Sequence, residues 1–109
     1  MSDPTYPPMS PELVRKRRDL APDIQKTFEA FSASVFADGA LPVKMKQLIA
    51  VAVAHVTQCP YCIGSHTKAA LRLGATEQEL METIWVAAEM RAGASYAHSA
   101  LSLTIMGDK

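Results

Sequence analysis

One short stretch of the sequence, residues 55–66, concentrates the side chains that could do redox chemistry. Cys59 and Cys62 are the two cysteines of the chain, and they lie three positions apart. Pro60 between them is typical of the first position of a helix. Both sulfurs would then sit at a helix N-terminus, where aligned amide dipoles favour an anion and lower the pKa of a thiol below about 8.5. The spacing therefore predicts a reactive pair of thiols.

A histidine completes this pattern. His66 follows Cys62 by four residues, so it would lie on the same helix face, within reach of that sulfur. It could accept the thiol proton or return a proton to a leaving group. Cys59 and Cys62 would be one helical turn apart and could form a disulfide bond. We favour a redox function, in which one thiolate attacks and the other cysteine resolves its sulfenic acid.

Two other interpretations of this stretch remain open. His55, Cys59, Cys62 and His66 follow the pattern H-x3-C-x2-C-x3-H, which could supply four zinc ligands. Structural zinc ligands usually come in pairs from two separate elements, so this interpretation ranks second. The third is that both cysteines are small, inert residues of the core. A haem-attachment motif is excluded, because Ile63 stands directly after Cys62 where that motif has histidine.

The elements around this stretch are predicted to be helices. Helix starts are marked by a proline in four places: Ser10-Pro11, Ala21-Pro22, Pro42 and Cys59-Pro60. Between residues 24 and 35 apolar side chains recur every three or four positions, which indicates a helix with one apolar stripe. The glycines of Asp38-Gly39 and Gly74 are expected to end helices. No alternation typical of strands occurs, so the predicted fold class is all-α.

The C-terminal third is predicted to form two helices. Residues 76–79, Thr-Glu-Gln-Glu, match a capping box and would begin a helix over residues 77–91. Gly93 is expected to break it, and a last helix would run to about residue 106. Alanines between residues 92 and 100 would permit close helix approach, so this segment is the expected place of subunit contact.

Composition sets the broad class of protein. The 109 residues indicate a single domain over residues 10–109, preceded by a proline-rich extended arm at residues 1–9. Eleven basic residues balance eleven acidic ones, so no global charge draws the chain to nucleic acid or anionic membranes. The first residues lack the apolar core of a signal peptide, and no run of about 18 apolar residues occurs. We expect a cytoplasmic protein, in which a close cysteine pair is catalytic or metal-binding.

At these residues the chain resembles the AhpD-like alkylhydroperoxidases of the carboxymuconolactone decarboxylase superfamily. The resemblance runs from residues 41–44 through Cys59-Pro60-Tyr61-Cys62 and His66 to residues 74–76. It implies an all-helical domain that assembles into rings, commonly homotrimers or homohexamers. It also implies reduction of hydroperoxides with electrons from a thiol or dithiol donor, and no cofactor or metal is expected. By this resemblance Cys62 attacks the peroxide, Cys59 closes the disulfide and His66 belongs to the proton relay.

One position departs from the family pattern. The family usually has a glutamate of the proton relay twelve residues before the first cysteine, and this chain has Gln47. An amide cannot accept a proton near neutral pH, although it can orient a neighbour by hydrogen bonding. His55, eight residues later, is a candidate substitute base; the alternative is a core histidine bonded to a backbone carbonyl. The decarboxylase branch typically lacks the cysteine pair, so the pair argues against lactone decarboxylation. The leading rival among enzymes is a thiol-disulfide oxidoreductase or a decarboxylase-like protein with another substrate.

Overall fold

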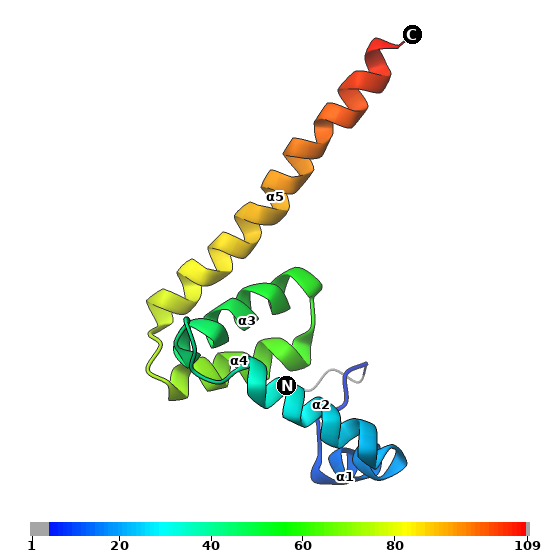
Figure 1. The fold of residues 1–109 in the computed structure, drawn as a ribbon. Helices are drawn as coiled ribbons and strands as arrows, with labels where there is room; N and C mark the ends of the chain where they lie inside the picture. Colours follow the sequence, from blue (N-terminus) through cyan, green and yellow to red (C-terminus); the bar gives the residue numbers. More distant parts are fainter. Residues whose placement is uncertain (1–4, 109) are drawn as a thin grey trace. The chain divides into compact units, whose positions relative to one another are not determined.

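The computed structural model describes residues 5–108, and this part of the chain contains helices and no strand. The five helices follow one another in the order α1 (Pro11–Leu20), α2 (Pro22–Val35), α3 (Val43–Thr57), α4 (Pro60–Arg72) and α5 (Glu77–Gly107) (Figure 1). The predicted all-α class is confirmed. The ring assembly is not part of a single-chain structure and stays a prediction.

The chain divides into two compact units, residues 1–40 and residues 41–109. The arm expected at residues 1–9 lies partly outside the described residues, and residues 5–9 form no helix. A single domain over residues 10–109 stays a prediction.

The first unit consists of α1 and α2, which contact each other. The Ser10 hydroxyl caps α1 by accepting the N–H of Leu13 at 3.2 Å, as the proline-marked start predicts. Neither helix contains a buried residue. The apolar stripe of α2 is present but exposed, with Phe28 and Phe31 both more than 60% accessible. The helix ends at Val35, a few residues before the predicted glycine stop.

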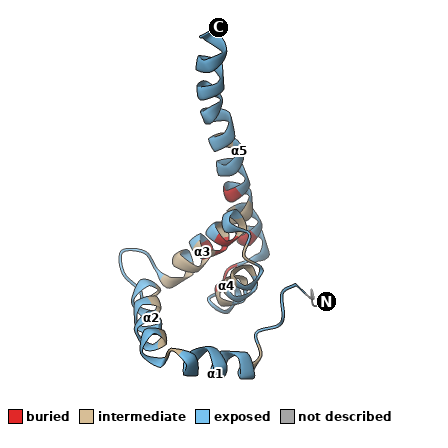
Figure 2. Ribbon diagram, turned by 90° about the vertical axis from the view of Figure 1, so that its right-hand side faces the viewer, coloured by how far each residue is buried: buried red, intermediate tan, exposed pale blue. Residues whose placement is uncertain are grey.

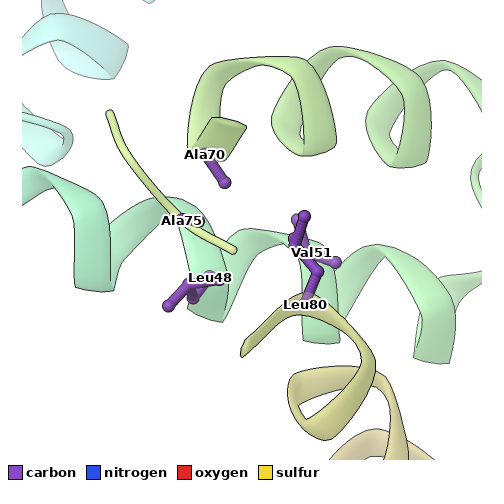
Figure 3. Close-up of a cluster of buried hydrophobic side chains, with 5 residues drawn as sticks. All are labelled: Leu48, Val51, Ala70, Ala75 and Leu80. Atoms are coloured by element: carbon purple, nitrogen blue, oxygen red, sulfur yellow. The ribbon is translucent and has the colours of Figure 1, made fainter. Parts of the chain in front are cut away.

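The second unit packs α3 against both α4 and α5. Five buried side chains form its core, as Figure 3 shows: Leu48, Val51, Ala70, Ala75 and Leu80. Val51 is fully buried. Three of the five residues are leucine or valine and two are alanines, so the helices approach closely around a small core.

The turn between α4 and α5 follows the sequence signals closely. Gly74 adopts φ +90°, a left-handed conformation that side chains with a Cβ rarely adopt. The capping box is present: Glu79 N donates to Thr76 Oγ1 at 3.0 Å, and Thr76 N donates to Glu79 Oε1 at 2.9 Å. Lys44 Nζ lies 3.1 Å from the same carboxylate, which ties the start of α3 to the start of α5.

The predicted break at Gly93 is wrong, because α5 continues through it for 31 residues. A glycine inside a helix costs only about 1 kcal/mol relative to alanine, and the alanine-rich residues around it are strong helix formers. Beyond Ala87 the helix has no buried residue (Figure 2). Its apolar side chains there are open to solvent, with Tyr96 83% exposed.

None of the helices over residues 5–108 combines the length and the apolar content needed to cross a lipid bilayer.

Candidate functional site

The site lies where α3 passes into α4. Only Gln58 and Cys59 separate the two helices. Gln58 takes a left-handed conformation with φ 58°, which is uncommon for a residue with a side chain. The N–H of Cys59 then donates to the Ala54 carbonyl at 3.1 Å. This short turn fixes Cys59 against the last turn of α3 and lets α4 fold back against α3.

Cys59 is the N-cap of α4, and Pro60 occupies the first helical position, as the sequence indicates. The Cys59 sulfur accepts the N–H of Cys62 at 3.3 Å. The two sulfurs share a hydrogen bond 2.7 Å long. Both cysteines are free thiols and half-buried. The structure therefore brings together the two sulfurs that the spacing paired, at the positive end of a helix.

The two thiols differ in acidity. The pKa of Cys59 lies below its ordinary value, chiefly because the Cys62 side chain hydrogen-bonds to its sulfur and then because the Cys62 amide does so. The pKa of Cys62 is raised by the same sulfur–sulfur hydrogen bond, by burial and by the charge that develops on Cys59. The first proton to leave the pair therefore leaves its charge mainly on Cys59.

His66 lies in the second turn of α4 and faces α3. Its Nδ1 is 2.7 Å from Oε1 of Gln47, and both residues are half-buried. The contact joins positions 19 apart in the chain. Gln47, at the sequence position where the resemblance led us to expect a glutamate, therefore hydrogen-bonds directly to the imidazole.

His55 has a different environment. Its Nδ1 lies 2.8 Å from the carbonyl oxygen of Val51, one turn earlier on α3. This is the arrangement expected of a histidine bonded to a backbone carbonyl. A role for His55 as a substitute base stays a prediction.

The zinc interpretation requires four ligands around one point. Among residues 5–108, no three histidine, cysteine, aspartate or glutamate side chains gather closely enough to hold a metal ion. The His55, Cys59, Cys62 and His66 side chains are therefore not brought together as a ligand set.

Arg91 is a neighbour of this junction that sequence reasoning missed. Its Nη1 donates to the carbonyl oxygen of Val56 at 3.3 Å, so α5 caps the last turn of α3. The two residues are 35 positions apart. No local spacing rule reaches across such a separation, and only the packing of α5 on α3 reveals the contact.

The arrangement defines a class of protein: a small helical protein with a dithiol at a helix N-terminus and an imidazole–amide pair beside it. Such a dithiol can give up two electrons and close to a disulfide. The family model for carboxymuconolactone decarboxylases matches residues 22–104. The chain belongs to the carboxymuconolactone decarboxylase family, which includes AhpD-like peroxidases.

Two curated relatives show how far the likeness extends. A protein of Paracoccus denitrificans, designated uncharacterized protein 4 in the cox locus, is 55% identical over 108 residues, which are 99% of this chain and 96% of that protein. An uncharacterized protein of Cupriavidus necator is 39% identical over 83 residues, covering 74% of each chain.

Solved structures share the fold. The apo form of a carboxymuconolactone decarboxylase family protein from Legionella pneumophila is 39% identical with a TM-score of 0.69, over 80% of this chain and 78% of that one. A Methanobacterium thermoautotrophicum protein is 34% identical with a TM-score of 0.73, over 76% and 93%. A Thermotoga maritima family member, linked in its name to an antioxidative response, is 22% identical with a TM-score of 0.56, over 73% and 92%.

Proposed function

We propose that this chain is a thiol-dependent peroxidase that reduces hydroperoxides through Cys59 and Cys62. The observation that carries the proposal is the 2.7 Å contact between the two sulfurs at the N-terminus of α4. A pair of free thiols held this close can be oxidised to a disulfide with little movement of the backbone. Membership of the carboxymuconolactone decarboxylase family supports the same chemistry.

In the first step the Cys62 sulfur attacks the outer oxygen of the hydroperoxide. The O–O bond breaks, a sulfur–oxygen bond forms, and the alcohol leaves as its alkoxide. His66 takes the proton of the Cys62 thiol and delivers it to the departing oxygen, so the step yields a sulfenic acid and a neutral alcohol.

In the second step the Cys59 sulfur attacks the sulfenic sulfur of Cys62. A disulfide forms, and the sulfenic hydroxyl leaves as water with the proton that Cys59 gave up. The lowered pKa of Cys59 supports this role, because a larger share of that sulfur is thiolate. A thiol or dithiol donor then reduces the disulfide by exchange and is itself oxidised to a disulfide.

The related Thermotoga maritima protein carries a name that links it to an antioxidative response. Removal of hydroperoxides would be such a response, so its name is consistent with the proposed chemistry. At 22% identity the structural likeness concerns the fold alone. The proposal therefore depends on the thiol pair of this chain.

The proposed peroxidase is a homo-oligomer. The second half of α5 carries exposed apolar side chains such as Tyr96, Leu101 and Leu103, and none of its residues beyond Ala87 is buried. A soluble protein rarely leaves such a surface uncovered. We expect this half of α5 to pack against other copies in a trimer or hexamer.

Thiol titration after addition of a hydroperoxide tests the proposal. The reduced protein should lose two thiols for each peroxide consumed, and a dithiol should restore both. Cys59→Ser should stop at a sulfenic acid on Cys62, detectable by mass spectrometry with a sulfenic-acid trap. Cys62→Ser should not consume peroxide at a comparable rate. Retention of both thiols in the wild type after excess peroxide would sink the proposal.

A second candidate is a thiol-disulfide oxidoreductase that does not act on peroxides. The observation that favours it is the half-buried Cys59 sulfur, which accepts the Cys62 amide at 3.3 Å. The Cys62 side chain and then this bond lower the pKa of Cys59, and a thiolate so formed attacks disulfides. Here the reduced protein would lose two thiols to a small disulfide substrate while remaining unreactive to hydroperoxides.

A further inference from the structure

The geometry points to Gln47 as a positioning residue that holds the proton of His66 on Nδ1 and leaves Nε2 as the nitrogen that exchanges a proton with Cys62. This inference concerns the same site and rests on the proposed function for its role in catalysis. The tautomer itself is a property of the resting protein.

The hydrogen bond between Gln47 and His66 determines which ring nitrogen carries the hydrogen. Gln47 Oε1 lies 2.7 Å from His66 Nδ1. An amide oxygen only accepts hydrogen bonds, so a bond this short requires that Nδ1 carry the hydrogen. A neutral imidazole has one N–H, and Nε2 is then the nitrogen with the basic lone pair. The hydrogen bond at one nitrogen thus selects the chemistry of the other.

The packing of α3 keeps Gln47 in place. Leu48, the next residue, belongs to the core, and Val51, one turn further on, is fully buried. Lys44, one turn before Gln47, is paired with Glu79 at 3.1 Å. The backbone that carries Gln47 is therefore held on both sides, so its amide reaches the imidazole from a fixed point on α3.

An amide at position 47, in place of a carboxylate, changes the path of the proton that His66 takes from Cys62. A carboxylate could accept the Nδ1 proton and pass charge onward, whereas the amide of Gln47 can do neither near neutral pH. The proton that His66 takes from Cys62 therefore stays on Nε2 until the alkoxide accepts it. In this chain the imidazole is a shuttle with a single exchanging nitrogen, and residue 47 supplies orientation without charge.

Nuclear magnetic resonance of protein labelled with ¹⁵N at histidine tests the tautomer directly. The chain has three histidines, and His66→Asn identifies the signals of His66 by their loss. In mildly alkaline buffer, wild-type His66 should carry its proton on Nδ1. Gln47→Glu should keep the proton on Nδ1, because a carboxylate oxygen also accepts a hydrogen bond from the Nδ1–H group. Gln47→Met should abolish the preference for Nδ1, since methionine has a similar length but offers no comparable acceptor.

The rate of sulfur oxidation is the second readout. Gln47→Met should lower kcat about ten- to a hundredfold, part of the 10²–10⁴-fold typical of general acid–base catalysis, with little change in KM. Gln78→Met, the same substitution at an exposed position on α5, is the matched control and should leave the rate unchanged.

Three results would overturn the inference. A wild-type His66 with its proton on Nε2 would mean that the amide is turned round and donates. A Gln47→Met protein with the wild-type tautomer would show that another group sets it. A folded Gln47→Met protein with wild-type kcat would remove the catalytic role. Because the spectra need no peroxide, failure of the peroxidase assay alone counts against the proposed function and leaves the tautomer result standing.

Discussion

Cys59 accepts the N–H of Cys62 with its sulfur, at 3.3 Å. At the starts of α1 and α5 the same bond is made by the hydroxyl oxygens of Ser10 and Thr76. The Cys59 sulfur therefore takes the place that an oxygen holds at the starts of α1 and α5. Because the amide donates to sulfur, the bond stabilises a thiolate and helps to separate the acidities of the two cysteines.

Alkylation should modify Cys59 before Cys62. The pKa of Cys59 is lowered by the Cys62 side chain and then by its amide, while the pKa of Cys62 is raised, so more Cys59 is thiolate at any pH below the ordinary value of 9.0. Peptide mass spectrometry after brief iodoacetamide treatment would give the order, and the rate against pH should have its first midpoint below 9.0.

Cys62→Ala is the informative variant for that experiment. It removes the side chain that is the largest cause of the lowered pKa and keeps the backbone amide. The midpoint for alkylation of Cys59 should move upward but stay below that of a free cysteine. Labelling of Cys62 first in the wild type would contradict the proposed order.

Folding stability should fall in acid through Glu79. Its pKa is lowered, first by the Thr76 N–H and then by Lys44, so the unfolded chain binds this proton more readily than the folded one. The stabilisation is complete above the ordinary value of 4.5 and is lost as the pH falls through the lowered pKa. Urea titrations across this range should show a flatter pH dependence for Glu79→Gln, and Lys44→Met should flatten it less.

Val51→Ala should lower the free energy of unfolding by about 2 to 3 kcal/mol, from lost apolar burial and the cavity left behind. Val51 is 0% exposed, whereas Val53 on the same helix is 53% exposed. Val53→Ala is therefore the matched control and should change the free energy by less than about 0.5 kcal/mol. Equal losses in denaturant titrations would show that α3 is buried on a different face.

Two glycines should respond in opposite directions to alanine. Gly74 has φ +90°, and Gly64 lies inside α4 with no atom within 4 Å of an added Cβ. Gly74→Ala should destabilise the protein by about 1 to 2 kcal/mol, because the left-handed conformation is strained for alanine. Gly64→Ala should stabilise it by up to about 1 kcal/mol through helix propensity. Thermal unfolding of the two variants side by side checks the signs.

Local signals predict much of this fold. The prolines at positions 11, 22 and 60 each stand at the first position of a helix, and the capping box at Thr76 forms as expected. These signals act through neighbouring backbone groups, so they can be recognised from the sequence alone. Gly93 is misleading because a single glycine is a weak helix breaker, and the strong helix formers on both sides outweigh it.

One part of the candidate site can be predicted from local spacing, and the other depends on how the helices pack. Cys59, Cys62 and Pro60 lie on one helical turn, so their spacing alone anticipates the sulfur contact. The pairing of His66 with Gln47 crosses 19 residues and depends on α3 packing against α4. From the sequence, Gln47 is recognised only as a departure from a family pattern, and its bonding partner becomes known from the structure.

Because the N-cap of α4 is a cysteine, the stability of the helix start depends on the oxidation state of the Cys59 sulfur. In a disulfide the Cys59 sulfur carries no negative charge, so it would accept the hydrogen bond from the Cys62 amide more weakly than a thiolate does. A hydroxyl in that place would hold the helix in every state but could do no electron transfer. In the proposed catalytic cycle the strength of this cap would therefore change each time Cys59 is oxidised and reduced.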